Sequence, residues 1–331
     1  MANLKDVAKL AGVSTATVSR VINGSEKVNN DTKKKVLKAV KALDFKPSRV
    51  AQRLRFKDGK RKLIGLIVPD IQNPFYVDVV KGVEDISYKH DYAILMCNFA
   101  QEEAKENLYI DLMRAESVDG LIVAPVHEKD PKVIGLIRSG LPTVCVDRGV
   151  EDEHVDIVVV DNIQGAFNAV ELLISKGHKR IAYIAGLPNI PTTTLRLKGY
   201  TAALKKYKIK VDEQLIRFGN SKHESGKRLA AELLEMKNPP TALFTGNNLI
   251  TLGALETIHT KGLKIPEEVA IIGFDDMPWS ISLNPPLTAV SQPGYDIGRS
   301  AAEMLFQRIA DPTRGNIKLE LKTKLVIRNS C

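Results

Sequence analysis

The hydrophobic residues near the start of the chain recur at helical spacing in three short segments. The first runs from Leu4 to about Ala11, the second from Thr15 to about Asn23, and the third begins at Asn30 or Asp31. The expected inward-facing residues are, in chain order, Leu4, Val7, Ala8 and Ala11, then Val18, Val21 and Ile22, then Val36, Leu37, Val40 and Leu43. The pattern predicts a small all-α unit with one shared core.

The connection between the first two segments has the chemistry of a tight turn. Gly12 stands where a chain leaving a helix often needs positive φ, and Ser14 is a good N-cap for the second helix. The outward residues of that helix are small or polar, with one long cation: Thr15, Ala16, Thr17, Ser19, Arg20 and Asn23. This pattern predicts a helix-turn-helix whose second helix lies in a DNA major groove. The alternative is a plain two-helix corner, although an exposed face with Arg20 and no acid is unusual for one.

From Leu63 onward, strand-like apolar runs alternate with helical patterns. The runs cover residues 63–68, 93–98, 119–124, 143–147, 157–161, 180–185, 241–245, 269–274 and 287–292. Continuous Val/Ile runs separated by helices indicate parallel sheets covered on both faces. There are more such units than one sheet needs, so the sequence predicts an α/β core of two doubly wound lobes. The stretch KLELKTKLVIR near the C-terminus is expected to be one further strand.

Charge is distributed unevenly along the 331 residues. Residues 1–62 hold 17 Lys/Arg and 5 Asp/Glu, whereas the rest of the chain holds 31 and 34. A basic head of this kind favours a polyanion as partner. We see no membrane span, lipidation signal or signal peptide, so we expect a cytoplasmic protein without membrane contact. Cys97, Cys145 and Cys331 are scattered and indicate neither disulfides nor a metal site.

The head has a specific family resemblance. Residues 6–23 (DVAKLAGVSTATVSRVIN) and 28–54 (VNNDTKKKVLKAVKALDFKPSRVAQRL) resemble the DNA-binding head of the LacI/GalR family of bacterial repressors. The resemblance implies a helix-turn-helix head over 1–46, a hinge helix and linker over 47–62, and an effector-binding and dimerisation core of the periplasmic-binding-protein type over 63–331. The first lobe is expected at about 63–161 plus 293–318, and the second at about 162–291 plus 319–331.

The segment from Arg49 to Arg55 is helical in pattern but too short to be stable alone. By resemblance it is the hinge helix that pairs with its twin in the DNA minor groove, with Leu54 as a wedge between base pairs. Arg49, Ala51 and Leu54 are therefore further candidate DNA contacts. The alternative is a flexible linker that happens to carry a leucine.

Ligands of doubly wound lobes bind at the carboxyl ends of the strands. Trp279 lies after one strand end, and the other candidates match the family's effector-binding residues: Asp70, Phe75, Arg148, Arg196, Asn247, Asp275 and Gln292. Aromatic faces and Asp, Asn and Arg side chains suit a sugar-like effector, although each residue could instead be structural. Many family members have Asn-Asp where this chain has Asn247-Asn248, which removes a carboxylate and makes the identity of the sugar less certain.

The resulting interpretation is a transcription repressor that binds pseudo-palindromic operator DNA as a homodimer under the control of a sugar or sugar derivative. The alternative is a catabolite-control regulator that responds to a phosphorylated carrier protein, because residues 292–298 (QPGYDIG) resemble those regulators, although Arg299 follows without a second arginine to grip a phosphate. A periplasmic sugar receptor fits poorly with the basic head. We find no catalytic motif, metal-ligand spacing or cofactor motif, and the glycines of residues 219–227 lack P-loop spacing. Without a leucine heptad tail, a dimer is expected.

Overall fold

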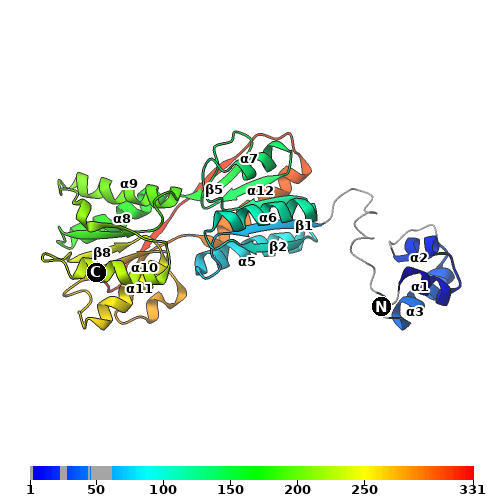
Figure 1. Ribbon diagram of the computed structural model, residues 1–331, viewed down its shortest axis with the longest axis horizontal. Helices are drawn as coiled ribbons and strands as arrows, with labels where there is room; N and C mark the ends of the chain where they lie inside the picture. The colour runs from blue at the N-terminus through cyan, green and yellow to red at the C-terminus, as the bar shows by residue number, and fades with distance from the viewer. Residues whose placement is uncertain (1–2, 23–27, 44, 46–61) are drawn as a thin grey trace. The chain divides into compact units, whose positions relative to one another are not determined.

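The computed structural model describes residues 3–22, 28–43, 45 and 62–331. The chain divides into two compact units, residues 1–61 and 62–331, and both are drawn in Figure 1. The expectations for Asn23, Arg49, Ala51 and Leu54 lie outside the described residues, as does the hinge segment apart from Lys62.

The N-terminal unit contains the three predicted helices, α1 (Leu4–Ala11), α2 (Thr15–Ile22) and α3 (Asn30–Ala42). Gly12 closes α1 in the left-handed conformation, with φ 64°. The Ser14 hydroxyl accepts the Thr17 N–H at 3.1 Å, so it caps α2 as predicted. The turn and cap chemistry therefore confirms the helix-turn-helix.

The inner face of α3 differs from the prediction at one residue. Val36 and Ala39 are buried, and Val40 and Leu43 pack against the same cluster, but Leu37 is 53% exposed. Successive residues of an α-helix point about 100° apart. Leu37 is thereby rotated away from the line of Val36, Val40 and Leu43, and its expected place in the core was wrong.

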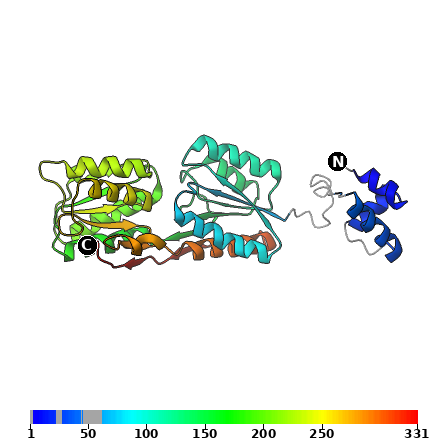
Figure 2. The same ribbon diagram turned by 90° about the horizontal axis from the view of Figure 1, so that it is seen from below.

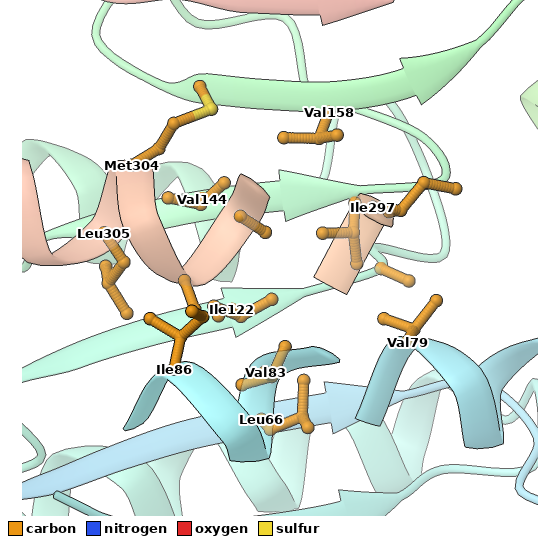
Figure 3. Packing of buried hydrophobic residues seen from close by; sticks show 14 of the residues in the cluster. Leu66, Val79, Val83, Ile86, Ile122, Val144, Val158, Ile297, Met304 and Leu305 are labelled. Atoms are coloured by element: carbon orange, nitrogen blue, oxygen red, sulfur yellow. The ribbon is translucent and has the colours of Figure 1, made fainter. Parts of the chain in front are cut away.

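The first lobe of the large unit is a six-stranded sheet in the order β11-β5-β4-β3-β1-β2, with parallel pairing throughout. Its strands are β1 (Leu63–Val68), β2 (Ala93–Asn98), β3 (Gly120–Val123), β4 (Thr143–Val146), β5 (Asp156–Val160) and β11 (Lys318–Leu321). Helices α5 (Pro74–Lys89) and α12 (Gly294–Ala310) cover one face, and α6 (Glu103–Glu116) and α7 (Pro131–Arg138) the other. Figure 3 shows the first face, where Val79, Val83 and Ile86 of α5 and Ile297 and Leu305 of α12 pack over the sheet.

The second lobe repeats this plan in the order β12-β10-β9-β8-β6-β7. Its strands are β6 (Ile181–Ala185), β7 (Ile216–Phe218), β8 (Ala242–Thr245), β9 (Ala270–Phe274), β10 (Thr288–Ser291) and β12 (Lys324–Val326). Helices α8 (Asn162–Ser175) and α9 (Pro191–Lys206) cover one face, and α10 (His223–Leu234) and α11 (Asn248–Thr260) the other. Each predicted strand-like run contains a strand, whereas the short β7 was not predicted. In the residues that the structure describes, no helix is long and apolar enough to cross a membrane.

The C-terminal stretch corrects two expectations. It is not one strand, because β11 pairs with β5 in the first lobe and β12 pairs antiparallel with β10 in the second. The first lobe therefore extends to Leu321, beyond the expected limit at residue 318. Between the two strands, the Thr323 N–H and hydroxyl both donate to Asp161 Oδ1 at 2.7 Å. Asp161 lies where the chain passes from β5 of the first lobe to α8 of the second, and Thr323 lies where it passes from β11 to β12. These hydrogen bonds therefore join two of the segments that connect the lobes.

Helices α5 and α12 lie side by side in close contact (Figure 2). A Cβ on Gly298 would stand 2.0 Å from the Val79 carbonyl oxygen, and one on Gly82 would stand 2.2 Å from that of Tyr295. The two backbones approach so closely that only glycine fits at these positions. The pair therefore forms one closely packed layer of the first lobe.

A buried carboxylate joins the end of that layer to the sheet edge. Asp156 on β5 is fully buried and pairs with Arg308 of α12 and with Arg314 of the following loop. It also accepts the Ile317 N–H at 2.8 Å, directly before β11. One carboxylate thus ties β5 to the continuous stretch 308–317, which lies more than 150 residues later in the chain.

Candidate functional sites

The second helix of the head presents the predicted polar surface. Thr15, Ala16 and Arg20 are exposed, and Thr17 and Ser19 are half-buried. Thr17 Oγ1 lies 2.9 Å from the Ser14 hydroxyl, so its side chain supports the cap. No acidic residue lies in the first turn of α2. The exposed surface can therefore offer a guanidinium, a hydroxyl and a methyl group to a polyanion.

A cavity of about 50 Å³ lies where the carboxyl ends of strands from both lobes meet. It is lined by Asn73, Phe75, Tyr76, Gln101, Asp147, Arg148, Gly186, Ile190, Thr192, Thr193, Arg196, Ser221, Gly246, Asn247, Asp275 and Gln292. Six of the eight candidates from the sequence are thus brought together, from segments that span more than 200 residues. This is the position that the doubly wound topology assigns to a ligand.

Arg196 is held rigidly on the side of the second lobe. Its Nε donates to Asn162 Oδ1 at 2.8 Å and its Nη1 to the Gly246 carbonyl at 2.6 Å. The guanidinium also stacks on the Phe274 ring, with its carbon 3.7 Å from the ring centre. These contacts fix the plane of a buried guanidinium at the cavity wall, which suits bidentate binding of oxygen atoms.

Asp275 directly follows β9, and its side chain meets that of Gln292, which directly follows β10. Its Oδ1 accepts the Gln292 amide at 2.5 Å, and its backbone has φ 75°, which is unusual for a residue other than glycine. Burial raises the pKa of this carboxyl, and the Arg196 charge partly opposes the shift. A strained, buried carboxylate beside an arginine is the kind of group found where a polar ligand is oriented.

Asp147 and Arg148 form the wall contributed by the first lobe. The Tyr76 hydroxyl donates to Asp147 Oδ2 at 2.9 Å, and burial followed by the Asp147 charge raises the pKa of that tyrosine. Arg148 donates to Gln101 at 3.3 Å, while its Nε is buried without a hydrogen-bond partner. Because an unpaired buried N–H is costly, this donor is a natural contact for an incoming oxygen.

Two candidates from the sequence lie outside the cavity lining. Asp70 accepts the Gln72 N–H at 2.9 Å in the turn before α5. Trp279 is half-buried in the short helical turn Pro278–Ser282 that follows β9. Both follow strand ends, and their place in these turns leaves them outside the cavity lining.

Other lining residues were not singled out from the sequence. Tyr76 follows Phe75 directly, and Thr192 and Thr193 lie in the first turn of α9 after Pro191. Gln101 and Ser221 come from loops without a distinct pattern, and both have positive φ. Only the strand-end rule, extended by several residues on each loop, could have identified them.

Glu106 is a buried carboxyl group of the first lobe that interacts electrostatically with Arg148. Glu106 of α6 is fully buried, and its Oε1 accepts the Val126 N–H at 3.1 Å. Burial, together with the neighbouring Asp130 charge, raises the pKa of Glu106 to about 8, against a smaller opposing effect of Arg148. Among the described residues, no group of His, Cys, Asp and Glu side chains could hold a metal ion.

The sequence-based alternative centred on Arg299 has a different environment. Arg299 Nη1 lies 3.2 Å from Glu303 Oε1, and Nη2 lies 3.3 Å from Asp296 Oδ1. The guanidinium is thus already engaged by two carboxylates on its own helix, which would compete with a phosphate.

Each of the two units matches a known family model. Residues 3–48 match the model described as bacterial regulatory proteins, lacI family. Residues 61–328 match the model described as periplasmic binding proteins and sugar binding domain of LacI family.

Curated relatives match over nearly the whole length. The HTH-type transcriptional repressor CytR of Escherichia coli (strain K12) is 35% identical over 99% of this chain and 96% of its own. The HTH-type transcriptional repressor PurR of Vibrio atlanticus (strain LGP32) is 35% identical over 100% of this chain and 98% of its own.

Solved structures show the same architecture. A complex of the transcriptional regulator CelR with cellobiose aligns with a TM-score of 0.76 and 32% identity, over 100% of both chains. A lac repressor dimer bound to operator and the anti-inducer ONPF aligns with a TM-score of 0.81 and 26% identity, over 99% of this chain and 98% of its own.

Proposed function

The chain belongs to the LacI family of bacterial regulatory proteins, and from this premise we propose that a sugar-like effector bound between its core lobes controls a dimeric repressor. The family makes it a DNA-binding transcription repressor and not an enzyme. The proposal concerns the operator contacts, the effector and the assembly. Since the molecule acts on the chromosome, we place it in the cytoplasm.

The operator contacts are assigned to the exposed face of α2. Arg20 can make a bidentate contact with guanine, and Thr15 and Ala16 lie beside the helix N-terminus that meets base edges in this motif. Thr17 and Ser19, which are half-buried, are assigned to contacts with the DNA backbone. Ala16 offers only a methyl contact with thymine.

The effector site is assigned to the cavity between the lobes, and its polar wall is the observation that carries this assignment. Arg148 and Arg196 supply donors, Asp147 and Asp275 supply acceptors, and Phe75 supplies an apolar surface. Equal numbers of buried cations and anions favour a neutral, hydroxyl-rich ligand over a strongly charged one. Solved relatives hold such ligands, namely cellobiose and ribose.

The small volume of the cavity restricts the conformations in which a sugar can bind. A cavity of about 50 Å³ has room for only a few water molecules. A sugar must therefore be bound with the lobes further apart than they are in this structure. The engaged state of Arg299 makes the carrier-protein alternative less favourable than the small effector.

The dimer is assigned to the first lobe. Strand β2 is a sheet edge, and Met96 on it is exposed, as are Ile71 beside it and Leu108 and Leu112 on α6. An edge strand bordered by exposed apolar residues is a surface that proteins usually cover. A second copy of the chain would cover it with the same surface, and two heads would then read a pseudo-palindrome.

Selection of DNA from a random library by the full-length protein tests these assignments. We expect a pseudo-palindromic consensus, and a single unpaired half-site would contradict the dimer. A thermal-shift screen with D-ribose, cellobiose, sugar phosphates and sugar acids then tests the cavity. A neutral sugar should stabilise the protein and change its affinity for the selected DNA, whereas a response confined to charged compounds would contradict the assigned ligand class.

A further inference from the structure

A direct hydrogen bond joins the two lobes beside the cavity. Asn248 Nδ2, at the start of α11 in the second lobe, lies 2.6 Å from Asn73 Oδ1, which precedes α5 in the first lobe. Both side chains are buried, with 1% and 7% exposure. Asn248 itself does not line the cavity.

The direction of this hydrogen bond is determined by a second one. Asn73 Oδ1 also accepts the Phe75 N–H at 2.9 Å and so caps α5. The atom of Asn73 that faces the second lobe is therefore an acceptor, and its partner must donate. Asn248 can donate through its amide, whereas an aspartate there would place a carboxylate oxygen against another acceptor.

We propose that Asn248 and Asn73 form a latch that holds the lobes closed, so that effector binding depends on a residue outside the cavity lining. The latch connects the N-termini of two helices that carry opposite walls of the cavity. Phe75 and Tyr76 lie at the start of α5, and Asn247 directly precedes α11. The consequence for the effector rests on the proposed function, whereas the consequence for lobe closure does not.

The hydrogen bond of the latch favours the closed form only weakly, because closure also leaves one polar atom without a partner. Asn248 Oδ1 is buried without a hydrogen-bond partner, and the second contact of Nδ2 is the weak acceptor Met277 Sδ at 3.4 Å. In an open form water would reach both atoms of this amide. Closure therefore gains one short hydrogen bond but leaves one carbonyl oxygen dry, and these effects oppose each other.

Apolar packing supplies a second contact between the lobes. Ile190, in the loop after β6 of the second lobe, is buried in the hydrophobic cluster of the first lobe, and Leu187 packs against the same cluster. This contact has no polar requirement. Loss of the latch should therefore weaken closure without separating the lobes completely.

The distance between spin labels on the two lobes of the full-length protein, measured without any effector, tests the latch. Exposed Lys129 and Lys222 lie on loops of opposite lobes and are suitable for replacement by cysteine, with Cys331→Ser. Cys97 and Cys145 are buried and free. Dilution with unlabelled protein suppresses distances between subunits.

The expected result is a ratio of closed to open molecules that falls about fivefold in Asn248→Asp, as for the loss of one hydrogen bond. Asn248→Ser, which is too short to reach Asn73, should give the same direction and serves if the aspartate variant does not fold. Asn73→Asp keeps both the cap and the acceptor and should match the wild type. Unchanged distances in Asn248→Asp or Asn248→Ser would overturn the latch, as would equal opening in Asn73→Asp. Because no effector is added, failure of the sugar screen would leave this measurement unaffected.

Discussion

Replacement of Arg196 by alanine removes the most firmly held donor in the cavity. The wild-type guanidinium is buried, stacks on Phe274 and donates to Asn162 and Gly246, so it is already oriented before a ligand arrives. A hydrogen bond from a charged group contributes about 1.5–3 kcal/mol. If Arg196 makes one such contact with the effector, Arg196→Ala should weaken effector binding about 10- to 150-fold.

Isothermal calorimetry with the sugar identified by thermal shift measures this loss. Arg196→Lys is the matched control, because lysine keeps the charge but loses the planar fork and the stack on Phe274. We expect its affinity to lie between those of the alanine variant and the wild type. Operator affinity without effector should be unchanged in both variants. A dissociation constant for Arg196→Ala within twofold of the wild type would refute the assigned role.

Three further substitutions test other parts of the molecule. Glu106→Gln replaces a carboxyl whose pKa is raised to about 8, so the wild type should lose stability relative to the variant as pH rises from about 4.5 to 8, by up to about 1.4 kcal/mol per pH unit. In urea titrations, the free energy of unfolding of the variant minus that of the wild type should be larger at pH 8 than at pH 5. An equal difference at the two pH values would contradict this. Asp156→Ala leaves two largely buried guanidinium groups without their carboxylate and should lower the free energy of unfolding of the core by about 3–5 kcal/mol in denaturant titrations; a loss below 1 kcal/mol would show that water replaces the carboxylate. Arg20→Ala should cost about 1–3 kcal/mol on the selected operator and far less on random DNA in gel-shift titrations, whereas equal losses would make Arg20 a phosphate contact.

The repeating elements of this fold were predictable because their causes are local. Helical spacing in the head and the Val/Ile runs of the core depend on a few neighbouring residues, and Gly12 and Ser14 act within one turn. Leu37 shows the limit of this reasoning, since an apolar residue next to a buried one need not be buried itself. The division of the C-terminal stretch between two sheets depends on partners about 160 and 40 residues away, β5 and β10.

The cavity was predictable to the extent that strand ends determine it. Arg148, Asn247, Asp275 and Gln292 follow strands within two residues, and the topology then brings them together. Asp70 and Trp279 also follow strands but do not line the cavity, so nearness to a strand end alone does not decide which side chains line it. Asn73 could be identified only as a turn residue, since its partner Asn248 is 175 residues away in the sequence.

The cavity is lined by residues of both lobes, which explains how a small ligand can shift the conformation of the core. A ligand shifts an equilibrium between conformations only by its difference in affinity for them. Here that difference is built in, because Tyr76, Asp147 and Arg148 belong to one lobe and Arg196 and Asp275 to the other. A ligand that touches both walls favours a separation of the lobes at which both walls are within its reach over a wider separation, at which the contacts with one wall are lost. The glycine contacts hold α5 closely against α12, so a displacement at the start of α5 would also displace α12.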